Sequence, residues 1–174
     1  MDEFRFSFGI PNSVVFPRLG IEDVEKASLI WADNYRKYHS SLRLFDGIEE
    51  VLTELKKRRY ILGIVTSKSR REFSADFATF GLEHLFNTVI CVDDSPRPKP
   101  NPDPILEYLK RSDAKKPETV YIGDTVYDEQ CAHSAGIDFA LAVWGTHNRE
   151  EIKADYFLET PLEILNLLPD RYGI

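Results

Sequence analysis

The sequence has little cysteine, and its 174 residues contain no apolar run long enough to span a bilayer. The two cysteines, Cys91 and Cys131, lie in apolar stretches and lack the spacing of metal ligands. No secretory signal is recognisable at the N-terminus, so these features predict a protein of the reducing cytoplasm. The four histidines are scattered, and we interpret them as surface or boundary residues: His39, His84, His133 and His147.

Positive charge is also scarce. The chain has 22 basic and 29 acidic residues, which gives a formal net charge of −7. This balance argues against nucleic acid or an anionic membrane as the main partner. Repeats and low-complexity tracts are absent, and 43% hydrophobic with 29% charged residues is typical of a globular protein. The length fits one domain plus a modest appendage.

Helical and strand patterns alternate from Asp46 onward. Helical spacing is clear at Ile48, Val51, Leu52 and Leu55. Short apolar runs then predict strands at 61–65, 88–92, 119–122 and 139–143, with helices between them. Strands that are apolar on both faces and separated by helices are typical of a parallel sheet covered on both sides. The sequence therefore predicts a doubly wound α/β domain.

Several helix ends carry capping signals. Ser69 and Glu72 have the spacing of a capping box, and Gly81 is placed to end the helix that they open. The residues Thr160, Pro161 and Glu163 combine an N-cap, an N1 proline and a capping-box acid. They predict the start of a last helix.

The first 45 residues have a different pattern. Helical spacing recurs at Val24, Ala27, Trp31, Tyr35 and Tyr38. We interpret residues 1–45 as a small helical subdomain joined to an α/β domain of residues 46–174. The aromatic stretch 4–10 could form a short strand at most, because it contains a glycine and precedes a proline.

Polar residues stand directly after the predicted strands, where ligands bind in an open parallel sheet. Thr66 and Ser67 offer hydroxyls and backbone amides at a helix start, which suits a phosphate group. Lys99 lies in a proline-rich loop and can hold a phosphate oxygen. The alternative interpretations are that the hydroxyls serve only the helix start and that the lysine is solvated.

A pair of carboxylates follows the third predicted strand. Asp124 and Asp128 are four residues apart, at a strand end and on the first helical turn, so both can face one point. Two carboxylates suit Mg²⁺, which takes its remaining ligands from water and a substrate phosphate. Alternatively, Asp124 is a helix N-cap and Asp128 a first-turn acid favoured by the helix dipole. The sequence leaves both interpretations open.

Taken in this order, the motifs resemble those of the haloacid dehalogenase-like hydrolase superfamily. Thr66 matches its second motif, Lys99 its third, and the Asp124/Asp128 pair its fourth. The likeness is greatest to the phosphoglycolate phosphatase and β-phosphoglucomutase-like branch, which has a Rossmann-like core with an inserted helical cap. Residues 1–45 resemble the later part of such a cap.

The family's first motif, Asp-x-Asp-x-Thr, does not occur in the sequence. In the family it supplies the nucleophile and the general acid/base, on a strand between the one ending at Thr66 and the one ending at Asp124. Without that strand, two buried edges lack partners, at a high cost in free energy. Three explanations are open: a reading frame started too late, a strand supplied in trans or by domain swapping, or a degenerate relative.

The resemblance implies a Mg²⁺-dependent phosphatase for small phosphorylated metabolites that works through an aspartyl-phosphate. It assigns Mg²⁺ to Asp124 and Asp128, and charge stabilisation at the phosphoryl group to Thr66 and Lys99. We expect the 174-residue chain itself to be inactive. The alternatives are a non-catalytic phosphate- or metal-binding protein and a phosphomutase of the same superfamily.

The missing strand also leads to structural expectations. The sheet is expected either to close, with 61–65 pairing with 120–122, or to accept a strand from another chain or from its own residues 4–10. Exposed apolar edges predict self-association through the gap.

Overall fold

All strands of the described chain are parallel and short. The computed structural model describes residue 7 and residues 9–169. The strands are β1 (Gly63–Val65), β2 (Thr88–Ile90), β3 (Val120–Gly123), β4 (Asp138–Ala142) and β5 (Tyr156–Leu158). The first four overlap the predicted apolar runs, with bounds shifted or shortened by one or two residues. The fifth was not predicted, because only Leu158 of its three residues is buried.

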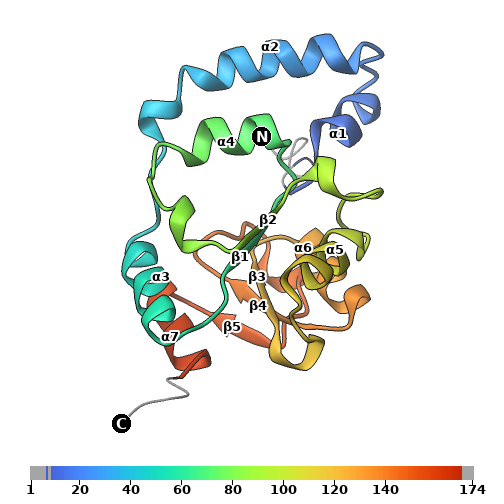
Figure 1. Ribbon diagram of the computed structural model, residues 1–174. Helices are drawn as coiled ribbons and strands as arrows, with labels where there is room; N and C mark the ends of the chain where they lie inside the picture. The colour runs from blue at the N-terminus through green and yellow to red at the C-terminus, as the bar shows by residue number, and fades with distance from the viewer. Residues whose placement is uncertain (1–6, 8, 170–174) are drawn as a thin grey trace.

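Helices cover both faces of these strands (Figure 1). On one face lie α3 (Ile48–Lys57) and α7 (Ile164–Leu167), and on the other lie α5 (Asp103–Ser112) and α6 (Val126–Ala135). Successive side chains of β4 point to opposite faces of the sheet, so the core has two layers. Phe139 packs in the α5/α6 layer and Ala140 in the α3/α7 layer. The predicted doubly wound α/β architecture is confirmed. Helix α4 (Arg70–Phe77) connects β1 to β2.

The strands form two separate sheets, β1–β2 and β3–β4–β5. In register, Val65 lies beside Ile90 and Val120 beside Asp138. Of the two alternatives expected for the gap, the pairing of β1 with β3 is wrong for the described residues, which show no ladder between these strands. Helix α5 packs on β1 and β2, α6 packs on β3 and β4, and the two helices pack side by side. Each of these two half-sheets, β1–β2 and β3–β4–β5, therefore packs on its own helix, and the contact between the two helices connects them.

The N-terminal part consists of α1 (Asn12–Arg18), α2 (Val24–Arg36) and the 3₁₀ turn η2 (His39–Ser41). It has its own apolar cluster of Ile10, Val15 and Phe16. None of the side chains of α2 is buried. The predicted boundary at residue 45 stays a prediction. Most of the stretch 4–10 lies outside the described residues, apart from Ser7, Gly9 and Ile10.

Helix ends follow the predicted caps in part. The capping box of Ser69 and Glu72 opens α4, but this helix ends at Phe77, and Gly81 lies in the following turn. Glu163 accepts the amide of Glu159 at 2.9 Å and not that of Thr160, so the predicted last box is not formed. The remaining 3₁₀ turns are η3 (Glu83–Leu85), η4 (Val92–Asp94), η5 (Lys116–Glu118), η6 (Arg149–Glu151) and η7 (Pro161–Glu163).

None of the helices in the described residues is both long enough and apolar enough to form a transmembrane span.

Candidate active site

The ends of β1 and β3 open into one cleft of about 1070 Å³. It is bordered by the N-terminal helices on one side and by the ends of the strands on the other. All the predicted site residues line it: Thr66, Ser67, Lys99, Asp124 and Asp128. The topology therefore brings together residues from three loops that are far apart in the sequence.

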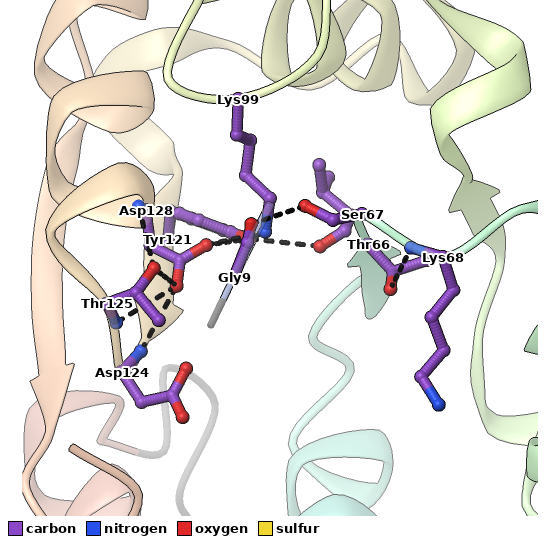
Figure 2. A network of polar contacts seen from close by, with 10 residues as sticks. Gly9, Thr66, Ser67, Lys68, Lys99, Tyr121, Asp124, Thr125 and Asp128 are labelled. Atoms are coloured by element: carbon purple, nitrogen blue, oxygen red, sulfur yellow. Dashed lines mark hydrogen bonds and ion pairs between the residues drawn. The ribbon is translucent and has the colours of Figure 1, made fainter. Parts of the chain in front are cut away.

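A buried ion pair lies at the centre of the site (Figure 2). Lys99 Nζ donates to Asp128 Oδ1 at 2.6 Å, and the two side chains are only 7% and 5% exposed. Burial by itself lowers the pKa of Lys99, but Tyr121 and Asp128 outweigh it and the pKa is raised. Burial by itself raises the pKa of Asp128, but Lys99 and the surrounding donors lower it. The pair is therefore charged at neutral pH.

The second oxygen of Asp128 holds the loop in front of α6. Thr125 is the N-cap of this helix, and it forms a capping box with Asp128. Oδ2 accepts the Thr125 hydroxyl at 2.6 Å and the amides of Thr125 and Asp124 at 3.1 and 3.3 Å. A Cβ atom at Gly123 would lie 2.6 Å from the Asp128 side chain, so this close approach requires glycine.

Asp124 differs from Asp128 in its surroundings. The alternative in which Asp124 is the N-cap is wrong, because Thr125 occupies that position. Figure 2 shows the Asp124 carboxylate turned away from the Lys99–Asp128 pair. Partial burial and the negative charge of Asp128 raise the pKa of Asp124. Its oxygens face the cleft and are placed to bind a cation.

The donor set fits a magnesium ion in part. Asp124 presents a hard carboxylate to the cleft, as Mg²⁺ requires. Both oxygens of Asp128 are already engaged by protein donors. The described residues contain no group of three acidic, His or Cys side chains that could hold a metal by themselves. Asp124 is thus the better direct ligand, and further ligands would come from water, from substrate or from another segment.

Tyr121 links the two half-sheets, a role that the sequence did not reveal. Its hydroxyl lies 3.0 Å from the carbonyl oxygen of Val65, 3.0 Å from Asp128 Oδ1 and 3.2 Å from Lys99 Nζ. A phenol has one proton, so it donates to Val65 or to Asp128 but not to both at once. Since Val65 precedes it by 56 residues, no local pattern could have indicated this contact.

The hydroxyl residues after β1 are engaged in local contacts. Thr66 accepts the Lys68 amide at Oγ1, at 3.2 Å, and Ser67 donates to the carbonyl of Gly9 at 2.6 Å. Gly9 has φ +84°, and a Cβ atom there would lie 2.7 Å from Oγ1 of Thr125. The N-terminal part therefore closes on the site at a position that only glycine fits. Sequence reasoning missed Gly9, although its glycine–apolar–proline context is a turn signal.

A second polar cluster joins the N-terminal helices to α4. Asp76 is buried and pairs with Lys68, and its other oxygen lies 2.8 Å from Nε2 of His39. The Lys68 ammonium also lies 4.9 Å from the centre of the Tyr35 ring. All four residues line the cleft. His39 is thus a partly buried boundary residue, within the range that the sequence suggested, and it lines the cleft.

A comparison of the whole sequence with known protein families agrees with this arrangement of the site residues. The sequence model of the haloacid dehalogenase-like hydrolases matches residues 1–142. The chain belongs to this family. The match covers the N-terminal helices and the core up to the end of β4.

Individual relatives cover most of the chain. The Pyrophosphatase PpaX of Bacillus velezensis is 32% identical over 146 residues, which are 82% of this chain and 68% of the relative. A crystal structure from Lactobacillus plantarum, provisionally assigned as a phosphoglycolate phosphatase, has 30% identity and a TM-score of 0.83 over 92% of this chain and 78% of that one. A HAD phosphatase from Thermococcus onnurineus has 27% identity and a TM-score of 0.68, covering 80% and 65%. The chain is a phosphatase-type member of the family.

Proposed function

We propose that the protein is a Mg²⁺-dependent phosphatase for small phosphorylated metabolites, whose nucleophile comes from a segment with the family's first motif. One observation carries the proposal: Thr66, Lys99, Asp124 and Asp128 converge in one cleft, around a buried Lys99–Asp128 ion pair. A buried charged pair is expensive to maintain for stability alone. Its position at the carboxyl edge of a parallel sheet supports a role in binding an anion.

Each residue of the site has a different proposed role. Lys99 holds positive charge beside the cleft, where it stabilises negative charge that spreads over phosphoryl oxygens. Thr66 places a hydroxyl at the end of β1, across the cleft from Asp124. Asp128 and Tyr121 do not need to touch the substrate, because their contacts orient Lys99 and the Asp124 loop.

Asp124 would hold the magnesium ion, and Asp128 would support it through the loop amides and through water. When bound, the ion neutralises the charge of the phosphate and orients it for in-line attack. Burial and the negative charge of Asp128 raise the pKa of Asp124, and a bound cation would oppose this shift because it stabilises the ionised carboxylate.

The polar residues that line the cleft favour a small substrate that carries a second polar group besides its phosphate. Lys68 lies on the same wall as Thr66 and Ser67, and Tyr35 and His39 face it from the N-terminal helices. The relatives named above include a pyrophosphatase and a protein provisionally assigned as a phosphoglycolate phosphatase. Phosphoanhydrides and phosphorylated small acids are therefore the first substrates to test.

A second candidate function is the binding of phosphate or metal without catalysis. It is favoured by the absence of Asp-x-Asp-x-Thr from all 174 residues, since none of the aligned polar residues can replace a carboxylate nucleophile. The proposed cellular setting is the reducing cytoplasm, supported by the two free, buried thiols of Cys91 and Cys131.

The deciding experiment compares the 174-residue chain with a form extended by a strand carrying Asp-x-Asp-x-Thr. We expect hydrolysis of p-nitrophenyl phosphate with Mg²⁺ only by the extended form. In it, Asp124→Asn should abolish most activity and raise the Mg²⁺ concentration needed for half the maximal rate. Lys99→Ala should slow turnover, and Lys99→Arg should restore it only in part because the guanidinium differs in shape.

Lys110→Ala is the matched control, since Lys110 is largely exposed on α5 and is not among the residues that line the cleft. An extended form that stays inactive while binding phosphate would favour the non-catalytic alternative. Undiminished turnover in Lys99→Ala would show that this lysine has no role in the reaction.

A further inference from the structure

The loop that carries Lys99 contains four prolines, at positions 96, 98, 100 and 102. A proline has no backbone N–H, so each of these residues lacks a hydrogen-bond donor. In the described chain, the one backbone hydrogen bond within 96–102 joins the Asn101 amide to the Pro98 carbonyl at 3.0 Å. The backbone by itself therefore does little to fix this loop, and side chains have to hold it.

Side-chain contacts close the loop. Asn101 donates Nδ2 to the same Pro98 carbonyl at 2.9 Å. Asp103, in the first turn of α5, accepts Nε of Arg97 at Oδ1, at 3.1 Å, and its Oδ2 lies 2.9 Å from Nη2. Contacts to both carboxylate oxygens restrict the orientation of the pair as well as its distance. The Arg97–Asp103 pair thus ties the start of the loop to the helix that follows it.

Asp103 is placed unlike an acid that serves only a surface ion pair. Its side chain is 12% exposed, whereas that of Arg97 is 64% exposed. Oδ2 is buried, and no donor in the described chain meets it at hydrogen-bonding angles. Burial of a carboxylate oxygen with an incomplete set of donors costs free energy. Stability alone does not account for this position, which indicates a role in function.

Lys99 is the site residue that depends on this loop. Among the described residues that line the cleft, it is the one member of the stretch 96–103. Figure 2 shows its side chain reaching from the loop toward Asp128 and Tyr121. Nζ lies 2.6 Å from Asp128 Oδ1, so the position of the ammonium depends on where the loop holds the lysine backbone. Helix α5 packs on β1 and β2, so Asp103 itself stands on an element that is anchored in the core.

We propose that Asp103 is a positioning residue for Lys99. Through Arg97 it ties the proline-rich loop to α5, and it thereby fixes the backbone from which the lysine reaches a phosphoryl group. This role rests on the proposed function, in which Lys99 stabilises charge on phosphoryl oxygens. A misplacement of about 1 Å lowers a reaction rate by up to about 100-fold, so a loop held at one end only should slow the reaction.

Amine acetylation of the 174-residue chain tests the proposal without any enzyme activity. Lys99 is 7% exposed and ion-paired, so N-hydroxysuccinimidyl acetate should modify it slowly. Lys57 is 70% exposed and serves as the internal reference. Mass spectrometry gives the ratio of the two rates, Lys99 over Lys57. We expect Asp103→Ala to raise this ratio about fivefold, which corresponds to the loss of about one hydrogen bond that holds the loop.

Two further variants separate the pair from the fold. Asp103→Asn keeps an acceptor oxygen for Arg97 and should raise the ratio about twofold or less. Arg97→Ala breaks the same pair from its exposed end and should raise the ratio as Asp103→Ala does. It keeps the test decisive if Asp103→Ala does not fold.

Glu107→Ala is the matched control. Glu107 lies four residues further along α5 and pairs in the same way with Arg111, whose Nε lies 2.7 Å from Oε1. Its side chain is 23% exposed, and it is not among the described residues that line the cleft. This variant should leave the acetylation ratio unchanged. Urea unfolding checks that all variants are folded under the labelling conditions.

A double-variant cycle in the extended form tests whether Asp103 acts through Lys99. Asp103→Ala should lower kcat about tenfold and change KM about twofold or less, because a misplaced lysine no longer stabilises the transition state. In a Lys99→Ala background the same substitution should have little further effect on kcat, since residues that act as a unit are not additive. A purely structural role would slow both backgrounds by the same factor.

The two experiments can fail separately. A ratio that rises equally in Asp103→Ala and Glu107→Ala, or in neither variant of the Arg97–Asp103 pair, would overturn the positioning role whatever the activity of the extended form. Additive effects of Asp103→Ala and Lys99→Ala on kcat would overturn it as well. A ratio that rises only when the pair is broken, with an extended form that hydrolyses no phosphate ester, would count against the phosphatase and still support Asp103 as the residue that places Lys99.

Discussion

The two sides of the candidate active-site cleft are built in different ways. At the end of β3, Lys99, Tyr121, Thr125 and Asp128 form a buried network within the α/β core. At the end of β1, Ser67 and Lys68 contact Gly9 and Tyr35 of the N-terminal part. The β3 side is therefore preorganised by the core, whereas the β1 side depends on how the N-terminal helices sit. Substitutions on the two sides should differ in kind.

The largest effect is expected for Asp128→Ala. It leaves the Lys99 ammonium buried without its partner and removes the cap of the Asp124 loop. Breaking a buried ion pair costs about 3–5 kcal/mol of unfolding free energy. Urea unfolding of the 174-residue chain measures this loss.

Asp124→Ala is the control for that experiment, because its carboxylate faces the cleft and leaves the ion pair in place. It should cost about 1 kcal/mol or less. Equal losses for the two variants would show that the β3 side is not organised by the Lys99–Asp128 pair. The sequence alone assigned both aspartates to the metal site.

Gly9→Ala should have the next largest effect, and it tests the β1 side. Alanine at φ +84° is strained, and its Cβ atom would overlap Thr125. Gly20→Ala is the matched control, since Gly20 has φ +75° but no atom within 4 Å of the added Cβ. We expect about 1 kcal/mol for Gly20→Ala and about twice that for Gly9→Ala. Equal unfolding free energies would mean that the contact with Thr125 is not formed in solution.

Tyr121→Phe should cost about 1 kcal/mol, because it removes the hydroxyl between Val65 and the buried pair. The exposed hydroxyl of Tyr156, 3.1 Å from Asp138, offers a comparison in Tyr156→Phe, which should change stability by about 0.5 kcal/mol or less. Thermal unfolding of both variants measures the difference. A smaller effect at Tyr121 than at Tyr156 would contradict the bridging role.

The smallest expected effect is a pH dependence of the unfolding free energy that comes from His133, a residue outside both sides of the cleft. Burial lowers the pKa of His133, but Asp155 and Glu129, each 2.9 Å from a ring nitrogen, outweigh it and raise the pKa. The stabilisation is therefore fully present below the pKa of unfolded histidine, about 6.5, and is lost as pH rises through the folded pKa. Because the ring is partly exposed, we expect about 0.5 kcal/mol.

Unfolding free energies at pH 5.5 and 8.5 test this effect against His133→Gln. The variant should lose the extra stability at the lower pH. A wild-type chain with the same pH dependence as His133→Gln would rule out the contribution.

The sequence predicted the fold better than the contacts of the site. Runs such as 88–92 and 139–143 are apolar on both faces, and this pattern is enough to predict buried strands. β5 was missed because Tyr156 and Phe157 remain partly exposed at the sheet edge. Motif order placed Thr66, Lys99 and Asp124 in one cleft, since the carboxyl ends of parallel strands share an edge. The contacts of Tyr121 and Gly9 span 56 and 58 residues and have no local signature.

The Tyr121 hydroxyl gives the gap and the cleft a shared equilibrium. Its single proton can go to the Val65 carbonyl at the gap or to Asp128 at the cleft. A strand that satisfies the Val65 carbonyl leaves that proton to Asp128, which lowers the proton affinity of the carboxylate beside Lys99. By thermodynamic linkage, any anion that prefers this state of the cleft must in turn tighten the hold of β1 on the strand. One phenol thereby couples the pairing of the β1 edge to the hydrogen bonding of the buried ion pair.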